Sequence, residues 1–328
     1  MHARGEAQSR LEALEGGRYE ARVLVPSPPA LTGPPWFADD PVDPGAAPRT
    51  RTVVSPVANA DRTWDDLARG DASLARWCAD RWLGAWRPIA AVGDIDAFVA
   101  TRVAWHTVAE HVLAPFRFQA CGKIGLRFTP GGVGIPFVRT DGAEVQLRVD
   151  GSTLVVDGDV ETREELTTMR DAARVAGIPV GARTEVYEPT TPCEPDDSLV
   201  IETTAAARLA DWFGFGASVL EETRAAAADG AATRVQVWPE HFDLSIDLGD
   251  EGAGRRGTFG ASPGDDAHPL PYLYVTHWAP VPDDPYWNES HFGGARLGYD
   301  RLVAADDPRR AALEFLAAGR ARLTAPRP

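Results

Sequence analysis

The segment from Val235 to Gly249 constrains the fold more than any other part of the chain, because apolar and polar residues alternate along it. The strict part of the alternation is His241, Phe242, Asp243, Leu244, Ser245, Ile246, Asp247 and Leu248. A period of two places the polar and the apolar residues on opposite faces of a β-strand. We therefore expect one continuous strand with an apolar face in the core and a polar face that carries imidazole and carboxylate groups.

Length and composition favour a globular protein. The chain has 328 residues, of which 44% are hydrophobic and 10 are tryptophan, enough for one large domain or two ordinary ones. The formal net charge is -15, and the arginines are scattered along the sequence. This charge pattern argues against nucleic acid and against an anionic membrane surface as partners.

Cysteine usage and the N-terminal sequence point to one compartment. Cys78, Cys121 and Cys193 are far apart and form no CxxC pair, which is typical of proteins in a reducing environment. The first residues contain no apolar signal segment, and no run of 18 apolar residues occurs in the chain. The predicted location is the cytoplasm.

The first part of the chain combines an irregular segment with helices and short strands. Residues 1–60 are rich in proline and are expected to be irregular, and two short helices are expected between Thr63 and Trp86. Asp94 is placed to cap a helix that runs to about Ala114 and ends at Pro115. Four strands separated by glycine-containing turns follow, at Gly122 to Phe128, Gly134 to Val138, Glu144 to Val149 and Thr153 to Asp157.

The remainder alternates helices and strands. Thr162-Arg-Glu-Glu165 has the form of a capping box and predicts a helix that ends at Gly177, and Ile178 to Glu188 is expected to be a strand. Thr203 or Thr204 is expected to cap the amphipathic helix that precedes the alternating segment. Two further strands are expected, at Arg255 to Ala261 and at Pro271 to Trp278. A loop is expected from Ala279 to Gly294, and a last helix is expected to begin at Asp307.

These elements predict an α+β protein with two similar halves, each a helix, an antiparallel sheet and a helix. The expected organisation is residues 1–60 as an irregular segment, residues 61–200 as the first half and residues 201–328 as the second, packed as one globular unit. The segments from Lys123 and from Arg256 share a strand followed by Thr-Pro-Gly or Ser-Pro-Gly, which suggests a duplication, although these turn sequences are also common by themselves. A true duplication would place the two sheets face to face with a ligand at their seam.

Several phrases carry a resemblance to known sequences. Trp238-Pro-Glu-His-Phe-Asp243, Gly260-Ala-Ser-Pro-Gly-Asp265 and Phe292-Gly-Gly-Ala295 are similar to phrases of an uncharacterised actinobacterial protein family. More distantly, Gly122-Lys-Ile-Gly-Leu resembles a wider bacterial domain family of unknown function. The resemblance covers roughly residues 95 to 300. It implies a bacterial cytosolic protein, and it implies neither an activity nor a catalytic residue.

His241 and Asp243 lie two residues apart on the expected polar face, as two ligands of one metal ion would. His277 and His291 follow in the sequence, with Glu289 close to His291, and a set of imidazoles and carboxylates suits Zn, Fe or Mn. The alternative is that His241 and Asp243 belong to the solvated face of an antiparallel strand.

The order of these residues also resembles the iron site of 2-oxoglutarate-dependent oxygenases. His241, Asp243 and His291 would be the metal ligands, and Arg301 would bind the cosubstrate. These enzymes need an eight-stranded double-stranded β-helix, and the sequence predicts too few strands between Asp243 and His291. Hydrolytic chemistry is therefore the preferred metal-dependent alternative, with Glu240 as general base.

Basic and aromatic residues offer a second kind of site. Lys123 is the only lysine of the chain, and together with Arg127 and Arg256 it could bind a carboxylate or a phosphate group. The same cations could equally neutralise an acidic surface. Trp238 and Trp278 could stack on a planar ligand, or could serve as core residues.

Two other groups of residues are expected to have structural rather than catalytic roles. His106 and Glu110 are one helical turn apart, but their order does not match the His-Glu-x-x-His motif, so we expect a hydrogen-bonded core histidine. Ser262 is followed by Pro263, which lacks the backbone N–H that an oxyanion hole would use. A nucleophilic serine is not expected here.

The sequence thus leaves three classes of function open. The first is the binding of a small polar or anionic molecule in a cleft between the two halves. The second is a metal-dependent enzyme, a hydrolase before an Fe(II)- and 2-oxoglutarate-dependent oxygenase, that uses His241 and Asp243. The third is a structural or interaction protein, with a homodimer as its simplest form.

Overall fold

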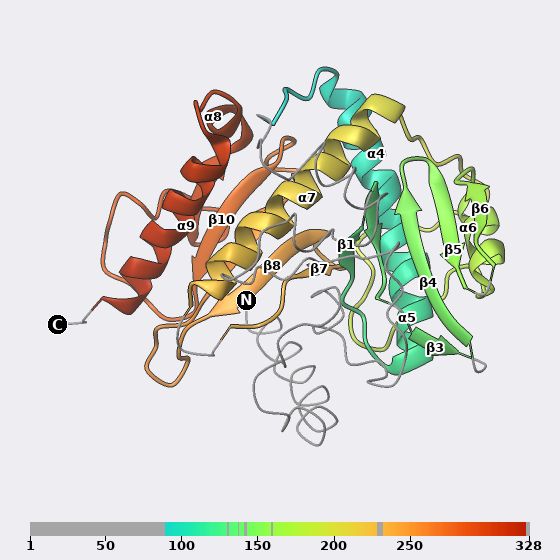
Figure 1. The fold of residues 1–328 in the computed structure, drawn as a ribbon, viewed down its shortest axis with the longest axis horizontal. Helices are drawn as coiled ribbons and strands as arrows, with labels where there is room; N and C mark the ends of the chain where they lie inside the picture. The colour runs from blue at the N-terminus through green and yellow to red at the C-terminus, as the bar shows by residue number, and fades with distance from the viewer. Residues whose placement is uncertain are drawn as a thin grey trace, which may run out of the picture.

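The computed structural model describes residues 89–129, 131–136, 138–140, 143–158, 160–227 and 232–325. The irregular segment expected at residues 1–60 and the two short helices expected before Trp86 lie outside the described residues. The described chain is an α+β fold of helices and two antiparallel sheets, which Figure 1 shows side by side. No helix in these ranges is long and apolar enough to span a membrane.

The first half is a long helical run followed by a sheet. Asp94 caps the run, as predicted, since its Oδ1 accepts a hydrogen bond from the N–H of Ala97 at 3.0 Å. The strands are ordered β1-β2-β4-β5-β6, and β3 pairs with β4 outside this order. The elements are α4 (Ile95–Val108), the π-helical turn η2 (Ala109–Leu113), α5 (Ala114–Cys121), β1 (Arg127–Thr129), β2 (Gly132–Gly134), β3 (Val138–Thr140), β4 (Ala143–Asp150), β5 (Thr153–Asp157), β6 (Thr162–Glu165) and α6 (Met169–Ala176).

The second half repeats this plan with one continuous α-helix in place of the helical run and a five-stranded sheet ordered β11-β10-β9-β8-β7. Asp307 caps the last helix, as predicted, by accepting the N–H of Arg310 at 2.9 Å. Each half is therefore a helix, an antiparallel meander and a helix. The elements are α7 (Thr203–Ala225), β7 (Gln236–Trp238), β8 (Asp243–Leu248), β9 (Gly257–Ser262), β10 (Tyr272–His277), β11 (Gly294–Gly298), α8 (Tyr299–Val303) and α9 (Pro308–Thr324).

The two sheets meet edge to edge. The N–H of Leu126 donates to the carbonyl oxygen of Val237 at 2.7 Å, and the N–H of Val237 donates back to Leu126 at 2.9 Å. β1 and β7 therefore lie side by side, and α7 packs on strands of both sheets. A true duplication was expected to place the two sheets face to face, whereas here a backbone bridge joins their edges.

The two similar sequence phrases fall on strands that do not correspond. The phrase from Lys123 leads into β1, the first strand of its half, whereas the phrase from Arg256 leads into β9, the third strand of its half. The likeness of the halves therefore lies in the order of their elements and does not extend to these two turns.

The first helical run continues past Pro115, where the sequence predicted its end. Ala109–Leu113 forms a π-helical turn, and the N–H of Ala114 bonds to the carbonyl of Ala109, five residues earlier. The wider turn relieves the clash that a proline ring makes with the preceding turn of an α-helix. The run ends before Gly122, whose φ of 73° is in the left-handed region that favours glycine.

The predicted capping box is a strand. Thr162–Glu165 forms β6, which pairs with β5 at the sheet edge, with all four side chains exposed. Helix α6 begins after Thr168, whose hydroxyl oxygen accepts the N–H of Asp171 at 3.1 Å, and it ends at Gly177 as predicted. Two further expectations also fail, because residues 178–188 contain no strand and Glu202 caps α7. The sequence did not predict strand β11, which begins at the end of the expected loop.

The alternating segment is two strands rather than one. β7 and β8 are antiparallel neighbours, with Trp238 opposite Asp243, and residues 239–242 form the turn between them. Pro239 cannot donate a ladder hydrogen bond, and Phe242 has a φ of 51°, which no strand residue adopts. Within β8 the predicted alternation of faces holds.

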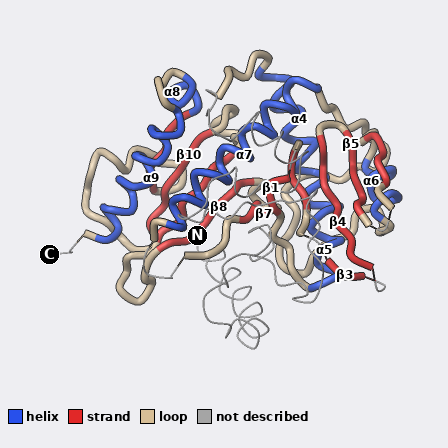
Figure 2. Tube along the Cα trace, viewed as in Figure 1, coloured by secondary structure: helices blue, strands red, loops and turns tan. Residues whose placement is uncertain are grey.

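The helices cover the apolar face of the second sheet. This face carries the buried side chains of Leu244, Ile246, Phe259, Ala261, Leu273 and Val275. Gly216 of α7 lies against Ala261, and Gly319 of α9 lies against Val275, so both helices approach the sheet closely where the side chain is smallest. Figure 2 shows α7 and α9 lying along the strands of this sheet.

Candidate functional site

The opposite face of the second sheet is polar. Residues directly opposite one another on neighbouring strands point to the same side of the sheet, so the strand register shows which residues share this face. The face carries Asp243, Ser245, Asp247, Thr258, Ser262, Tyr272 and Tyr274, and all of them except Thr258 are buried. We call this surface the polar face. Buried polar groups need hydrogen-bond partners, so the contacts among them show what the surface is built to do.

A hydrogen bond between Asp243 and Tyr274 lies at the centre of the polar face. Tyr274 on β10 is directly opposite Gly260 on β9, and its hydroxyl donates to Oδ2 of Asp243 on β8. The ring of Tyr274 therefore crosses over Gly260, and a Cβ at Gly260 would collide with it. Oδ1 of Asp243 is buried and has no hydrogen-bond partner.

Tyr272 extends the polar face toward the loop between β9 and β10. Its hydroxyl donates to Oδ2 of Asp265 at 2.5 Å, and Asp265 also accepts the N–H of His268 through Oδ1 at 2.7 Å. Burial raises the pKa of Tyr272, and the hydrogen bond to Asp265 raises it further. Tyr272 is therefore a protonated hydrogen-bond donor at neutral pH.

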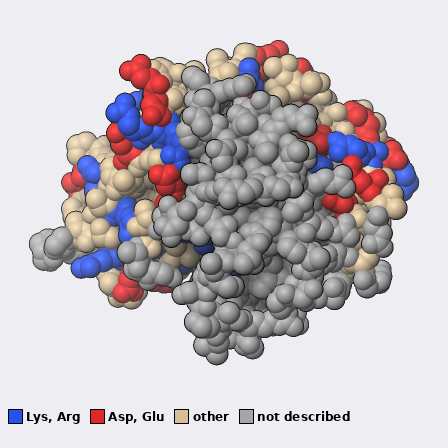
Figure 3. All heavy atoms as spheres, in the orientation of Figure 1, with Lys and Arg blue, Asp and Glu red and all other residues tan. Residues whose placement is uncertain are grey.

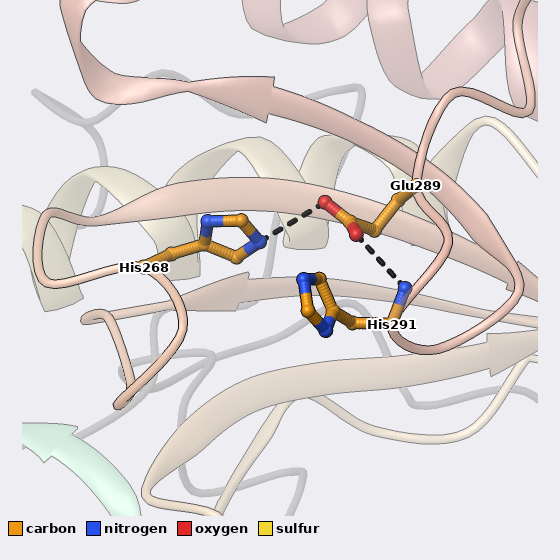
Figure 4. Close-up of side chains that lie close together, drawn as sticks. All are labelled: His268, Glu289 and His291. Carbon is orange, nitrogen blue, oxygen red and sulfur yellow. Dashed lines mark hydrogen bonds and ion pairs between the residues drawn. The ribbon is translucent and has the colours of Figure 1, made fainter.

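Two loops bring His268, Glu289 and His291 together, as Figure 4 shows. Nε2 of His268 lies 3.0 Å from Oε2 of Glu289, and the backbone N–H of His291 donates to Oε1 of Glu289 at 3.0 Å. The two imidazole rings are nearly perpendicular, with centroids 5.6 Å apart. One possible ligand atom of each residue lies within 4.8 Å of the other two. We call these three residues the His-Glu-His cluster.

Glu289 anchors the cluster. Its side chain is buried, and Nε of Arg296 on β11 donates to Oε2 at 2.8 Å. Burial opposes ionisation of Glu289, but the N–H of His291 and the interactions with Arg296 and His268 outweigh it and hold the pKa of Glu289 below its ordinary value. The cluster therefore contains an ionised carboxylate at neutral pH.

Arg102 of α4 connects the first half to the cluster. Its guanidinium donates to the carbonyl oxygen of Pro269, the residue after His268, at 3.1 Å. Burial lowers the pKa of Arg102, and the negative charges of Asp265 and Asp266 oppose this effect. The loop that carries His268 is thus held in place by both halves of the protein.

The cluster has the donor types and nearly the spacing of a metal site. Two ligand atoms at about 2.1 Å from one ion are about 3.0 Å apart at a right angle and about 3.4 Å apart at a tetrahedral angle. The 3.0 Å between His268 and Glu289 fits this range. The limit of 4.8 Å for all three residues exceeds the tetrahedral value by about 1.4 Å, a distance that side-chain rotation can close. His291 is exposed, so the third ligand lies at the surface.

Of the four metal ligands predicted from the sequence, the structure places only His291 in this cluster. His241 is exposed in the turn before β8. His277 lies at the far end of β10, alternates onto the helix-covered side, and its Nδ1 contacts the carbonyl of Ala279 at 3.0 Å. Asp243 binds Tyr274 instead. Among the described residues, His291 groups with His268 and Glu289 and not with the other three predicted ligands, and alternation along β10 turns His277 to the helix-covered face.

The predicted general base, Glu240, belongs to a different buried cluster. It lies half-buried in the turn between β7 and β8. Burial raises the pKa of Tyr187, and the nearby charges of Glu110 and Glu240 raise it further. Glu240 therefore lies close to Tyr187 of the first half.

His106 and Glu110 are structural, as predicted. Nε2 of His106 lies 2.8 Å from the carbonyl oxygen of Pro239. The buried carboxylate of Glu110 accepts the backbone N–H groups of Thr190 and Thr191 at 2.8 and 2.7 Å. These bonds fasten the π-helical turn to the loop that precedes α7.

The three basic residues predicted to bind an anion are divided between two places. Arg127 is buried at the junction of the sheets and donates to Oε1 of Gln236 at 2.9 Å. Lys123 is half-buried in the loop before β1, whereas Arg256 directly precedes β9. Arg127 thus lies at the sheet junction, whereas Arg256 lies at the start of the third strand of the second sheet.

Arg256 and Trp278 do lie together, in a group that also contains Asp247 and Thr258. The guanidinium of Arg256 lies 4.8 Å from the ring centre of Trp278 and 3.6 Å from Oδ2 of Asp247. Nε1 of Trp278 donates to the hydroxyl of Thr258 at 3.0 Å. Trp238 packs elsewhere, beside a small core of the first half, so the two tryptophans do not flank one ligand.

Sequence reasoning missed His268, and it placed Glu289 close to His291 without counting it among the four predicted ligands. The two residues lie in different loops, so no short motif joins them. The loop with His268 precedes β10 and the loop with Glu289 follows it, so the two loops start from opposite ends of that strand, and the second loop folds back until Phe292 stacks on Tyr272. No sequence pattern signals this return. Residue type alone would not have selected His268 over His277.

Charge on the described surface is mixed. Figure 3 shows basic and acidic side chains interspersed on both visible sides of the molecule, without a large area of one sign among the residues that are coloured.

Comparisons with protein-family models, with curated proteins and with solved structures found no match for this chain. The resemblance to uncharacterised actinobacterial proteins therefore stays a prediction, and the function has to be argued from the geometry of the site.

Proposed function

We propose that the protein binds a divalent transition metal at His268, Glu289 and His291 and uses it to hydrolyse a small polar molecule at the polar face. The observation that carries this proposal is the convergence of two imidazoles and an ionised carboxylate within 4.8 Å. Two histidines and one glutamate are a ligand set found in catalytic zinc sites, where the remaining position holds water.

The surroundings support a catalytic rather than a purely structural metal. Structural zinc sites are closed by four protein ligands, whereas the described residues supply three here. Arg296 and the N–H of His291 orient the Glu289 carboxylate, as partners in the shell around a metal site commonly do. Exposure of His291 leaves an approach for water and substrate.

The metal would supply one kind of chemistry. It lowers the pKa of a bound water to about 7, so that hydroxide is available at neutral pH. Such a hydroxide would be suited to attack an acyl carbon, with the leaving group departing and taking up the proton that the water had released. The same two-histidine, one-carboxylate set also suits Fe(II), so the identity of the metal separates hydrolytic from oxidative chemistry.

Elemental analysis of protein purified without a histidine tag tests the metal site. We expect about one Zn, Mn or Fe per chain and a loss of affinity of about 10-fold or more in His268→Ala and His291→Ala. His277→Ala and His241→Ala are matched controls and should retain the metal. A folded protein that takes up no added metal, or equal losses in the control variants, would contradict the proposal.

Hydrolysis of p-nitrophenyl acetate tests the reaction class. The rate of metal-loaded protein should rise as the pH passes about 7, because the metal-bound water then ionises. A chelator should abolish this rise and added metal should restore it. A rate that is the same with and without metal would leave a metal site but remove the hydrolytic role.

A further inference from the structure

The buried carboxylate of Asp243 lacks a hydrogen-bond partner for one of its two oxygens. It is 4% exposed, and while Oδ2 accepts the hydroxyl of Tyr274, Oδ1 has no hydrogen-bond partner. No basic side chain among the described residues forms an ion pair with it. Burying a carboxylate without a cation or a full set of donors is costly, so such a group calls for a partner that the chain itself does not supply.

Three aromatic rings form a group that includes Tyr274, the hydrogen-bond partner of Asp243. The ring of Tyr274 lies 6.2 Å from that of Tyr272, and Phe292 lies 5.7 Å from Tyr274 and 6.3 Å from Tyr272. Three rings grouped in this way next to a carboxylate favour an ammonium group, which is attracted both to ring faces and to the negative charge. An anion would meet the charge of Asp243 instead.

The nearby arginines do not neutralise Asp243. Arg296 binds Glu289, and its guanidinium lies 5.9 Å from the ring centre of Tyr272. Arg102 donates to the carbonyl oxygen of Pro269, on the loop side of the cluster. Oδ1 of Asp243 therefore has no cationic partner among the described residues.

We propose that Asp243, Tyr274, Tyr272 and Phe292 form a subsite for the ammonium group of a small amine, beside the His-Glu-His cluster. The subsite adjoins the cluster because the ring of Tyr272 lies 5.4 Å from that of His268. This inference rests on the proposed function, since it names the substrate class of the same site. It replaces the anionic ligand expected from the sequence with a cationic one.

Three probes of matched size test the subsite: cyclohexylamine, cyclohexanol and cyclohexanecarboxylate. Their dissociation constants are measured by ligand-observed NMR on the full chain, with and without added zinc. Cyclohexylamine should bind at least about 10-fold more tightly than the other two, because a hydrogen bond to a charged group contributes about that much. Equal binding of the alcohol and the amine would overturn the inference.

Asp243→Asn keeps the shape of the side chain and removes its charge. It should weaken cyclohexylamine about 10-fold and leave cyclohexanol unchanged. Asp306→Asn is the matched control, because Asp306 is exposed and lies just before α9. Phe292→Ala is a second variant that leaves the buried carboxylate intact, and it should weaken the amine about threefold.

The outcomes separate the two proposals. Preference for the amine that survives a chelator supports the subsite even where elemental analysis finds no metal. A bound metal without preference for the amine retains the proposed function and rejects the subsite. Two metal ions per chain, falling to one in Asp243→Asn, would also reject it, because the second ion would then be the partner of Asp243.

Discussion

Gly260 is the residue on which the geometry of the polar face depends most directly. The ring of Tyr274 lies over it to reach Asp243, and β9 has no room for a side chain there. Gly260→Ala should therefore displace Tyr274, break its bond to Asp243 and lower the free energy of unfolding by about 1–3 kcal/mol, the usual cost of overpacking. Urea denaturation followed by circular dichroism measures this change.

Two variants show whether the ring is the cause. Combining Gly260→Ala with Tyr274→Ala should cost less than the sum of the single changes, because the collision is absent once the ring is removed. Gly252→Ala, in the exposed turn before β9, should stay within about 0.5 kcal/mol of the parent. Strict additivity of the first pair would mean that Gly260 has another role.

At this scale the sequence predicted part of the candidate site. Asp243 was identified because alternation in β8 puts it on a polar face, and His291 because its residue type and position suited a metal ligand. His268 was missed because its role depends on Glu289 from another loop, and His277 was wrongly included because one residue of register decides its face. Residue type predicts the chemistry, whereas register and loop packing decide which residues take part.

At the scale of elements, two similar threonine patterns lead to different structures. Thr162 and Thr168 each precede an acidic residue by three positions, yet only Thr168 caps a helix, since Thr162 is in β6. Thr168→Ala should therefore lower the free energy of unfolding by about 1 kcal/mol, the usual cost of removing a cap. Thr162→Ala, at an exposed edge position, should change it by less than about 0.5 kcal/mol.

The free energies of unfolding of Thr168→Ala and Thr162→Ala, measured by thermal or urea unfolding, show which threonine caps a helix. A larger loss for Thr162→Ala would restore the capping box that the sequence predicted. The local pattern could not make this choice, because pairing of β6 with β5 is a tertiary contact that outweighs capping preference.

The loop between β10 and β11 is fastened to α9 through Asp284. Its carboxylate accepts the N–H of Tyr286 at 2.7 Å and the Nε–H of Arg322 at 2.9 Å. The backbone bond from Tyr286, followed by the bond from Arg322, lowers the pKa of Asp284. A carboxyl group with a lowered pKa stabilises the fold above its unfolded pKa of about 3.9, and this contribution is lost as the pH falls through the folded value.

Asp284→Asn should therefore lower the melting temperature at pH 7 and at pH 5. The difference from the parent should shrink below about pH 4, where the parent carboxylate also becomes protonated. Melting curves at these pH values, recorded by circular dichroism, measure the difference. A gap that stays constant down to about pH 3 would show that the ionised carboxylate is not the stabilising species.

For the whole molecule, the sequence predicted the class and the repeated order of elements but not how the halves join. An antiparallel meander follows from strand lengths and turn residues, which are local. The junction depends on one bridge between Leu126 and Val237, which are far apart in the sequence and lie in segments without an unusual pattern. The position of the candidate site follows from this junction, because Arg102 reaches the His268 loop only when the halves are so arranged.

The bridge and the shared helix α7 imply that the two halves unfold together. α7 packs on strands of both sheets, and Gly216 brings it against Ala261 of β9, so Gly216→Val should push the helix off the second sheet at a cost of about 1–3 kcal/mol. If the halves are one cooperative unit, the protection of amide hydrogens against exchange should fall by the same factor in β5 and in β9, although the substitution touches only the second sheet. Val160→Ala, at a side chain that is 79% exposed, is the control and should change neither strand. Faster exchange confined to β8, β9 and β10 would instead mean that each half is stable by itself, and Arg102 would then hold the His268 loop across an interface that can open.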